Sequence, residues 1–197
     1  MKVLVVSAHP VTGSFTNHLR DRAVAVLRRR GHDVQVTDLY VEGFEARLSR
    51  AEWQGHRDDA SGKTDVAPYA QQLLRAEALV LVYPTWWSGM PAIMKGWVDR
   101  VWIEGVAYTL PAGRSRVRAN LRNIRRVTVI SPHGSSKWVN VLEGETGKHM
   151  VGRALRVLLH PRARTQWLAI YDMDRADPVR LARFTTRVER AMARLGS

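Results

Sequence analysis

Short aliphatic runs alternate with segments of helical periodicity along the chain. The strand-like runs occupy residues 2–7, 34–39, 78–83, 126–130 and 166–171. Helices are expected over residues 15–30, 68–76, 91–101, 148–159 and 178–195, with a short one near 49–56 in the polar segment 41–67. Unbroken aliphatic strands separated by helices are typical of a parallel sheet covered on both faces. The pattern predicts a doubly wound α/β fold with a five-stranded parallel sheet in the order 2-1-3-4-5.

The composition excludes several kinds of chemistry and says less about the fold. The 197 residues suit a single domain over residues 1–197, and 45% of them are hydrophobic. The chain has no cysteine, which excludes disulfides, thiolate nucleophiles and iron–sulfur clusters, and we expect no metal site. Redox chemistry would therefore need a bound organic cofactor. No apolar run approaches the roughly 18–20 residues of a membrane helix, so we expect no membrane insertion and a cytoplasmic location.

The loop after the first strand carries polar groups at the start of a helix. Ser14, Thr16 and Asn17 stand where backbone N–H groups and the helix dipole favour a phosphate. Ser14 or Thr16 would serve equally as an ordinary helix cap. The glycine pattern matches neither the dinucleotide fingerprint nor a Walker A loop. Phosphate binding and capping both stay open here.

The loop after the third strand contains two adjacent tryptophans, Trp86 and Trp87, between Thr85 and Gly89. In a doubly wound sheet, ligands bind at the carboxyl ends of the strands near the switch in strand order, where this loop lies. A planar ring could stack on one indole. The alternative is a hydrophobic turn or a subunit contact. The pair in this position favours a site.

The loop after the fourth strand offers backbone donors. Gly134 lets the backbone approach a ligand closely, and neighbouring N–H groups could support negative charge on a planar ring. His133 could donate or relay a proton, although a lone histidine often has only a local structural role.

Three segments together resemble a known family. They are Ala8-His9-Pro10 through Ser14-Phe15-Thr16-Asn17, the stretch 84–101 with its Gly-x-Pro-Ala-Ile-x-Lys-Gly-Trp core, and Ser131 through Ser135. They resemble the flavodoxin-like NAD(P)H:quinone oxidoreductases, which include DT-diaphorase-type enzymes, bacterial quinone reductases and ancillary oxidoreductases of potassium-efflux systems. The similarity runs over about residues 1–175, in the right order.

The resemblance implies a flavodoxin-like three-layer sandwich and a ping-pong reaction. NADPH or NADH would reduce a bound FMN or FAD, which would then reduce a quinone or a similar planar electrophile. The resemblance also implies a homodimer, in which Trp97 would face the partner subunit. The flavin contacts that it implies are His9, Ser14, Phe15, Asn17, Pro84, Thr85, Trp86, Trp87, Ser88, Ser131, His133, Gly134 and Ser135.

The chain departs from the family in two places. DT-diaphorase-type enzymes have a tyrosine and a histidine for proton relay after the third of these loops, whereas residues 137–144 contain neither. His133 is then the remaining catalytic candidate in that loop, and Trp138 is expected to shape the substrate pocket. The extended C-terminal region of the longer FAD enzymes has no counterpart, so we expect FMN, with FAD as the alternative.

The formal charge of +13 admits other interpretations. A solvated basic surface accounts for it, and nucleic-acid binding would need interleaved aromatic residues or a recognisable module. Neither is present, so we expect no nucleic-acid partner. The alternative function is a regulatory flavoprotein partner of a potassium-efflux system, without a dedicated substrate.

Overall fold

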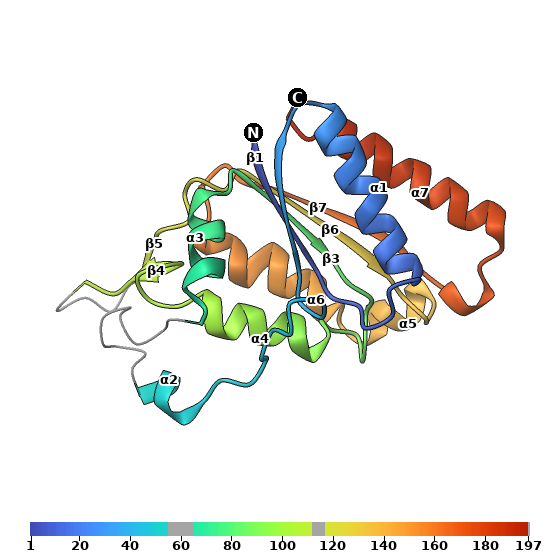
Figure 1. Ribbon diagram of the computed structural model, residues 1–197. Helices are drawn as coiled ribbons and strands as arrows, with labels where there is room; N and C mark the ends of the chain where they lie inside the picture. Colours follow the sequence, from blue (N-terminus) through green and yellow to red (C-terminus); the bar gives the residue numbers. More distant parts are fainter. Residues whose placement is uncertain (55–64, 112–116, 197) are drawn as a thin grey trace.

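Five parallel strands form the central sheet of the computed structural model, which describes residues 1–54, 65–111 and 117–196. The strands are β1 (Lys2–Ser7), β2 (Asp33–Asp38), β3 (Ala78–Val82), β6 (Arg126–Pro132) and β7 (Arg164–Ile170). Their order is β2-β1-β3-β6-β7 (Figure 1). This is the expected order 2-1-3-4-5, so the prediction of the fold is confirmed.

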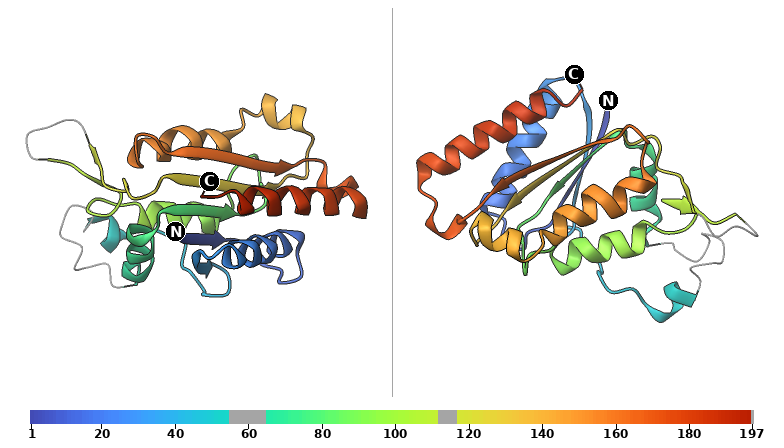
Figure 2. Two further views of the ribbon diagram at one scale, coloured as in Figure 1. Left: turned by 90° about the horizontal axis from the view of Figure 1, so that it is seen from above. Right: turned by 180° about the vertical axis from the view of Figure 1, so that it is seen from behind.

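Helices cover both faces of the sheet, giving three layers (Figure 2). α1 (Phe15–Arg29) and α7 (Pro178–Ala193) pack on one face. α3 (Ala67–Arg75) and α4 (Ala92–Val101) pack on the other. Alternate residues of β1 feed the two cores, since Val3 and Val5 belong to the first and Leu4 and Val6 to the second. None of the helices that the structure describes is both long and apolar enough to cross a bilayer.

Local sequence signals set the ends of the helices. Ser14 caps α1, and the helix ends before Gly31, whose φ of +76° is a conformation that glycine adopts without strain. Asp177 caps α7 by accepting a hydrogen bond from the Arg180 amide at 2.6 Å, and Pro178 occupies the first helical position.

The structure differs from the predicted elements in three places. The helix expected over residues 148–159 is split into α6 (Thr146–His149), a π-helical segment η2 (Met150–Leu155) and a 3-10 turn η3 (Arg156–Leu158). α5 (Lys137–Leu142) and the antiparallel pair β4 (Tyr108–Thr109) and β5 (Arg118–Ala119) were not expected. These elements are too short for periodicity to reveal.

The short helix near 49–56 appears as α2 (Arg50–Gln54), and its expected last two positions lie outside the described residues. A 3-10 turn, η4 (Met173–Arg175), follows β7.

Arg100 ties the polar segment after β2 to α4. Arg100 is 5% exposed, and its guanidinium bonds Glu52 at 2.7 Å and also contacts Asp65 and the Glu45 carbonyl. It lies 5.3 Å from the centre of the Phe44 ring. Burial by itself lowers the pKa of Arg100, but Glu52 and Asp65 together raise it above its ordinary value. The pairing therefore keeps a buried cation charged at this contact.

Trp97 lies inside the core, so the expectation that it faces a partner subunit is wrong. Its side chain is fully buried within its own chain and packs edge-on against Trp102, with 6.2 Å between the ring centres. Helical spacing places Trp97 beside Met94, Val98 and Val101 on the buried face of α4. Within the family-like stretch 84–101, the tryptophan of the Lys-Gly-Trp sequence is therefore a core residue.

Gly96 gives the sharpest test of this packing. A Cβ at Gly96 would stand 2.2 Å from the Ala46 carbonyl oxygen and 2.6 Å from the Ala46 Cα. Because backbone atoms would have to move, we expect Gly96→Ala to lower the free energy of unfolding by about 1–3 kcal/mol or more. Urea unfolding followed by circular dichroism measures the effect. Gly152→Ala is the control, since a Cβ there meets nothing within 4 Å. Equal stabilities of the two variants would contradict the close approach.

Candidate functional site

The carboxyl ends of β1, β3 and β6 lie side by side, so the loops that follow them start together. Ser7 is paired with Val82, and Val82 with Ile130. The alignment continues into the loops, where Thr85 and His133 form an isolated parallel bridge. The Thr85 amide donates to the Pro132 carbonyl at 2.9 Å. The second and third loops are therefore fixed to each other through their backbones.

A cavity of about 360 Å³ opens between these loops, within the range of small-ligand sites. All three loops contribute to its wall, as does the turn after β7. The lining residues are His9, Ser14, Phe15, Thr16, Pro84, Thr85, Trp86, Pro132, Gly134, Met173 and Asp174. The sequence thus located the cavity, although Thr16, Pro132, Met173 and Asp174 were not among the expected contacts.

In the first loop, the start of α1 faces the cavity. Ser14 accepts a hydrogen bond from the Asn17 amide at 3.2 Å, which confirms the capping interpretation, and Ser14 also lines the cavity. The first N–H groups of a helix have no acceptor within it, and the first turn of α1 contains no acidic residue. The side chain of Asn17 has a different role, because it is buried and its Nδ2 donates to the Val11 carbonyl at 2.9 Å. It holds the loop instead of facing the cavity.

The second loop contains a strained turn. Trp87 and Ser88 both have positive φ, +49° and +58°, and the turn is closed by paired backbone hydrogen bonds between Trp86 and Gly89. Non-glycine residues rarely adopt this conformation, and such strain gathers at functional sites. Trp86 lines the cavity, whereas Trp87 is fully exposed. The Ser88 hydroxyl bonds Glu143 and its carbonyl accepts from Thr146 Oγ1 at 2.5 Å, so Ser88 lies outside the cavity.

The third loop is built around a hydrogen-bonded histidine. His133 Nδ1 lies 2.7 Å from Asn140 Oδ1, and the Asn140 amide nitrogen donates to Ser135 Oγ and the Ser136 carbonyl. Asn140 Oδ1 is therefore an acceptor, which places the proton on His133 Nδ1. Nε2 then accepts from Thr85 Oγ1 at 3.2 Å, and Thr85 Oγ1 is 2.9 Å from Ser131 Oγ.

Burial lowers the pKa of His133, while the bond with Asn140 and the charge of Glu145 act in the opposite direction. The ring is 5% exposed and packs against Tyr171 with 4.7 Å between ring centres. Both ring nitrogens are thus engaged within the protein, and the imidazole is neutral. This geometry favours a positioning role for His133, and its catalytic role stays a prediction.

The remaining expected contacts lie around the cavity instead of in its wall. Ser131 is buried behind Thr85, and Ser135 bonds Asn140. Trp138 is 68% exposed on α5, outside the cavity of the single chain. Asn140 and Tyr171 were missed by sequence reasoning. Asn140 lies on a helix of six residues, and Tyr171 follows the end of β7, at the same sheet edge that identified the other loops.

The residues present suit a phosphorylated planar cofactor. The N-terminal turn of α1 offers backbone donors and contains no acidic residue, as an anion needs, and Asp174 in the wall of the cavity comes from the turn after β7. Trp86 is 42% exposed beside the cavity, available for stacking. Gly134 leaves the wall open, because a Cβ there would meet only Asp174 Oδ2, at 3.4 Å. Within the described ranges, no three His, Asp or Glu side chains are grouped to hold a metal ion.

Fold and cavity together define a flavodoxin-like protein. The family model described as a flavodoxin-like fold matches residues 1–193, and the chain belongs to this family. The expected resemblance to its NAD(P)H:quinone oxidoreductases is also confirmed by named relatives. An NAD(P)H dehydrogenase [quinone] 1 of Cavia porcellus is 31% identical over 156 residues, 71% of this chain and 56% of the relative.

Two further comparisons agree. A ribosyldihydronicotinamide dehydrogenase-like protein of Penicillium crustosum is 35% identical over 125 residues, 56% of this chain and 47% of that protein. The solved NAD(P)H:quinone oxidoreductase from Methanothermobacter marburgensis is 27% identical with a TM-score of 0.81, and the match covers 100% of this chain and 98% of that one. The matches span about half the length of the curated relatives.

The pKa of His133 predicts a pH dependence of stability. Its pKa is lower in the folded chain than the ordinary value of about 6.5, so the unfolded chain takes up the proton first as the pH falls. The contribution of neutral His133 is full above about pH 6.5 and is lost as the pH falls toward the folded pKa. Each unit of difference is worth about 1.4 kcal/mol.

We therefore expect the unaltered chain to lose more stability between pH 7.5 and 5.5 than His133→Gln. Urea unfolding at both pH values measures the two losses, and only the difference between them is compared. His18→Gln, an exposed histidine on α1, is the matched control and should keep the wild-type pH dependence. Parallel pH profiles for wild type and His133→Gln would show that His133 is not held neutral.

Proposed function

We propose that this chain is a flavin-dependent NAD(P)H oxidoreductase that reduces quinones or similar planar electrophiles. The observation that carries the proposal is the convergence of the three loops on one cavity with a helix N-terminus at one side and an exposed indole, Trp86, at another. The names of the relatives support the same reaction class. When bound, a flavin accepts a hydride from a nicotinamide cofactor and passes it to the acceptor.

Some residues would contact the flavin, and others hold those residues in place. Ser14, Phe15 and Thr16 would hold the phosphate at the start of α1, with His9 at the edge of the cavity. Pro84, Thr85 and Trp86 would contact the ring from the second loop, and the backbone at Gly134 would reach its polar edge. His133 fixes Thr85 through Nε2 and is itself fixed by Asn140. We propose FMN as the flavin, with NADPH or NADH as the reductant, in a ping-pong sequence within one domain.

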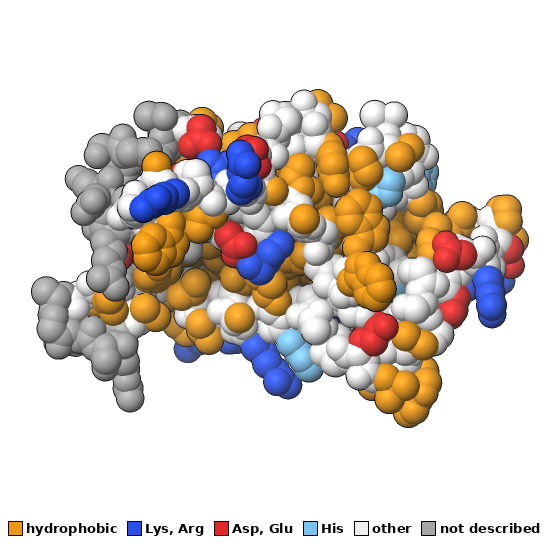
Figure 3. All heavy atoms as spheres, turned by 90° about the horizontal axis from the view of Figure 1, so that it is seen from below, with side chains coloured by type: hydrophobic (Ala, Val, Ile, Leu, Met, Phe, Trp, Pro, Cys, Tyr) orange, Lys and Arg blue, Asp and Glu red, His pale blue; other side chains and the backbone are white. Residues whose placement is uncertain are grey.

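We also propose that the active protein is a homodimer. Large apolar side chains are exposed near the cavity, among them Trp87 at 102%, Leu142 at 69% and Trp138 at 68%. Figure 3 shows hydrophobic side chains gathered on the face of the molecule below the sheet. Large apolar side chains exposed in this number favour an interaction surface. A second subunit would cover it, and Trp87 and Trp138 would then bound the substrate pocket.

Absorption spectroscopy and turnover test the proposal directly. The purified protein is supplied with FMN or FAD and then desalted. It should retain a flavin that absorbs near 450 nm, at about one flavin per chain. It should then oxidise NADPH or NADH only when a benzoquinone is present as acceptor. A chain that retains neither flavin at micromolar concentration would overturn the proposal.

Gly134→Val tests the place of binding. The added side chain would enter the cavity wall next to Asp174, so we expect at least a tenfold loss of flavin affinity with little loss of stability. Fluorescence quenching of the flavin measures the affinity, and thermal unfolding confirms the fold. Gly152→Val, the same change where a Cβ meets nothing within 4 Å, should bind flavin as wild type does. Unaltered flavin affinity in Gly134→Val would move the flavin away from this cavity.

A further inference from the structure

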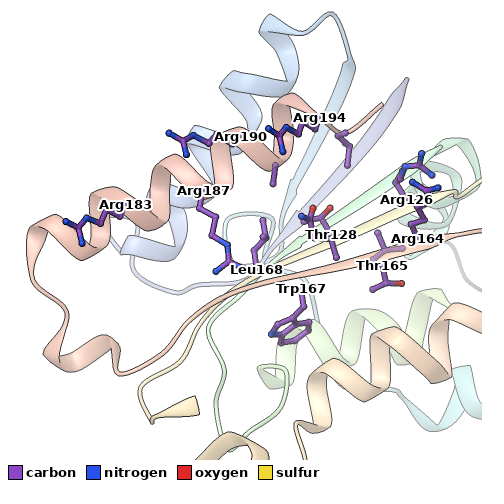
Figure 4. A pocket seen from close by; sticks show the side chains of 14 residues that line it. Arg126, Thr128, Arg164, Thr165, Trp167, Leu168, Arg183, Arg187, Arg190 and Arg194 are labelled. Atoms are coloured by element: carbon purple, nitrogen blue, oxygen red, sulfur yellow. The ribbon is translucent and has the colours of Figure 1, made fainter. Parts of the chain in front are cut away.

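A second cavity, of about 600 Å³, lies between α7 and the β6–β7 edge of the sheet (Figure 4). It shares no lining residue with the cavity at the carboxyl ends. Arg126 and Arg164 are the first residues of β6 and β7, roughly 20 Å along the strands from the carboxyl ends. Among the described residues, no aspartate or glutamate lines this arginine groove, and six arginines do: Arg126, Arg164, Arg183, Arg187, Arg190 and Arg194.

The arginines form two arrays on opposite walls. On α7 and at its C-cap they stand at positions 183, 187, 190 and 194, a spacing of four, three and four that places them along one helix face. The row is about 16 Å long, since each helical residue rises about 1.5 Å. The inner face of the same helix carries Phe184, Val188 and Met192 in the core. On the sheet, Arg126 and Arg164 are directly paired in the β6–β7 register.

Most of the arginine charges in the groove have no carboxylate partner among the described residues. Arg126, Arg164, Arg183, Arg187 and Arg190 form no ion pair with any carboxylate among the residues that the structure describes. The acidic residue on this stretch of α7, Glu189, pairs with Arg22 of α1. Like charges one helical turn apart repel each other, and a concave wall concentrates their potential. A bound polyanion would remove this repulsion.

The floor of the groove indicates a compact ligand. It is recessed between the arrays, with Thr128 and Leu168 buried and Gln166 exposed as a polar group on the same face of the sheet. Trp167 has its indole on the opposite side of the sheet, near His133 (Figure 4). The described lining of the groove thus offers no aromatic ring for stacking nucleic-acid bases along this row.

We infer that the arginine groove binds an oligophosphate, a ligand with three or four phosphate groups in a row. A phosphate monoester carries about 1.5–2 negative charges at neutral pH, whereas a carboxylate carries one. In a linear oligophosphate each inner phosphate carries one negative charge and each terminal phosphate about 1.5–2, so three or four phosphates bring roughly four to six charges to the five guanidinium groups that have no carboxylate partner among the described residues. A carboxylate ligand would need about five separate groups in the same space. The guanidinium fork also bonds phosphate oxygens in pairs. This binding is independent of the proposed flavin chemistry at the other end of the sheet.

Isothermal titration calorimetry of the full chain with sodium tripolyphosphate, at about 0.15 M salt, tests the inference. We expect one ligand per chain, and orthophosphate should bind at least tenfold more weakly. Arg187→Gln/Arg190→Gln should weaken binding at least tenfold. The control, Arg50→Gln/Arg75→Gln, removes the same charge from two residues that do not line the groove and should change affinity less than twofold, because exposed charges that do not contact the ligand are screened by salt.

Thermal unfolding provides a second measurement. Tripolyphosphate should raise the Tm of wild type and of the control variant equally, and at the same concentration it should raise the Tm of the groove variant less. ATP, compared with tripolyphosphate, distinguishes a nucleotide from an inorganic source of the same phosphate chemistry, and either ligand supports the inference. Absence of binding, or equal weakening in both variants, would overturn it. So would tighter binding of a six-residue oligothymidylate or a hexaglutamate peptide, since the ligand would then be nucleic acid or an acidic protein.

Discussion

The site depends on the contact between Thr85 and His133. Strand pairing aligns β3 and β6 only as far as Val82 and Ile130, and loops beyond that point are ordinarily free to separate. Here the ladder continues through the bridge between Thr85 and His133, and the Thr85 hydroxyl adds bonds to Ser131 and His133. Asn140 completes the network from α5. The positions of Thr85 and Gly134 in the cavity wall follow from this fixed pairing.

Strain and packing act on the opposite side of the same loop. Trp87 and Ser88 hold positive φ, which costs free energy on the order of 1 kcal/mol or more for each residue. The bonds of Ser88 to Glu143 and Thr146 keep this turn in place. Immediately after it, α4 is pressed against residue Ala46 through Gly96 and is tied to Glu52 through Arg100. The second loop is therefore held at both ends, which keeps Trp86 at the cavity while Trp87 extends outward.

Much of the fold could be predicted because its signals are local or periodic. Buried parallel strands are continuous aliphatic runs, and their carboxyl ends identify the site edge without coordinates. The directions of side chains could not be obtained this way. Asn17 and Ser14 are three positions apart on one helix turn, yet one is turned to the loop backbone and the other to the cavity. From the motif we expected Trp97 at the surface, facing a partner subunit, and only the packing of α4 shows that it is buried. Asn140 lies on a helix too short to leave a periodic signal, and the helical pattern over residues 148–159 did not show that Met150–Leu155 is π-helical.

Hydrogen exchange with and without FMN, read by mass spectrometry, tests the central claim that three loops form one flavin site. The account predicts that FMN slows exchange in the segments around residues 9–16, 84–89 and 132–135 together, and leaves the outer face of α7 unchanged. The three segments should respond at the same FMN concentration, because one ligand contacts them all. Protection of only one of these loops, or protection along α7 instead, would contradict the account.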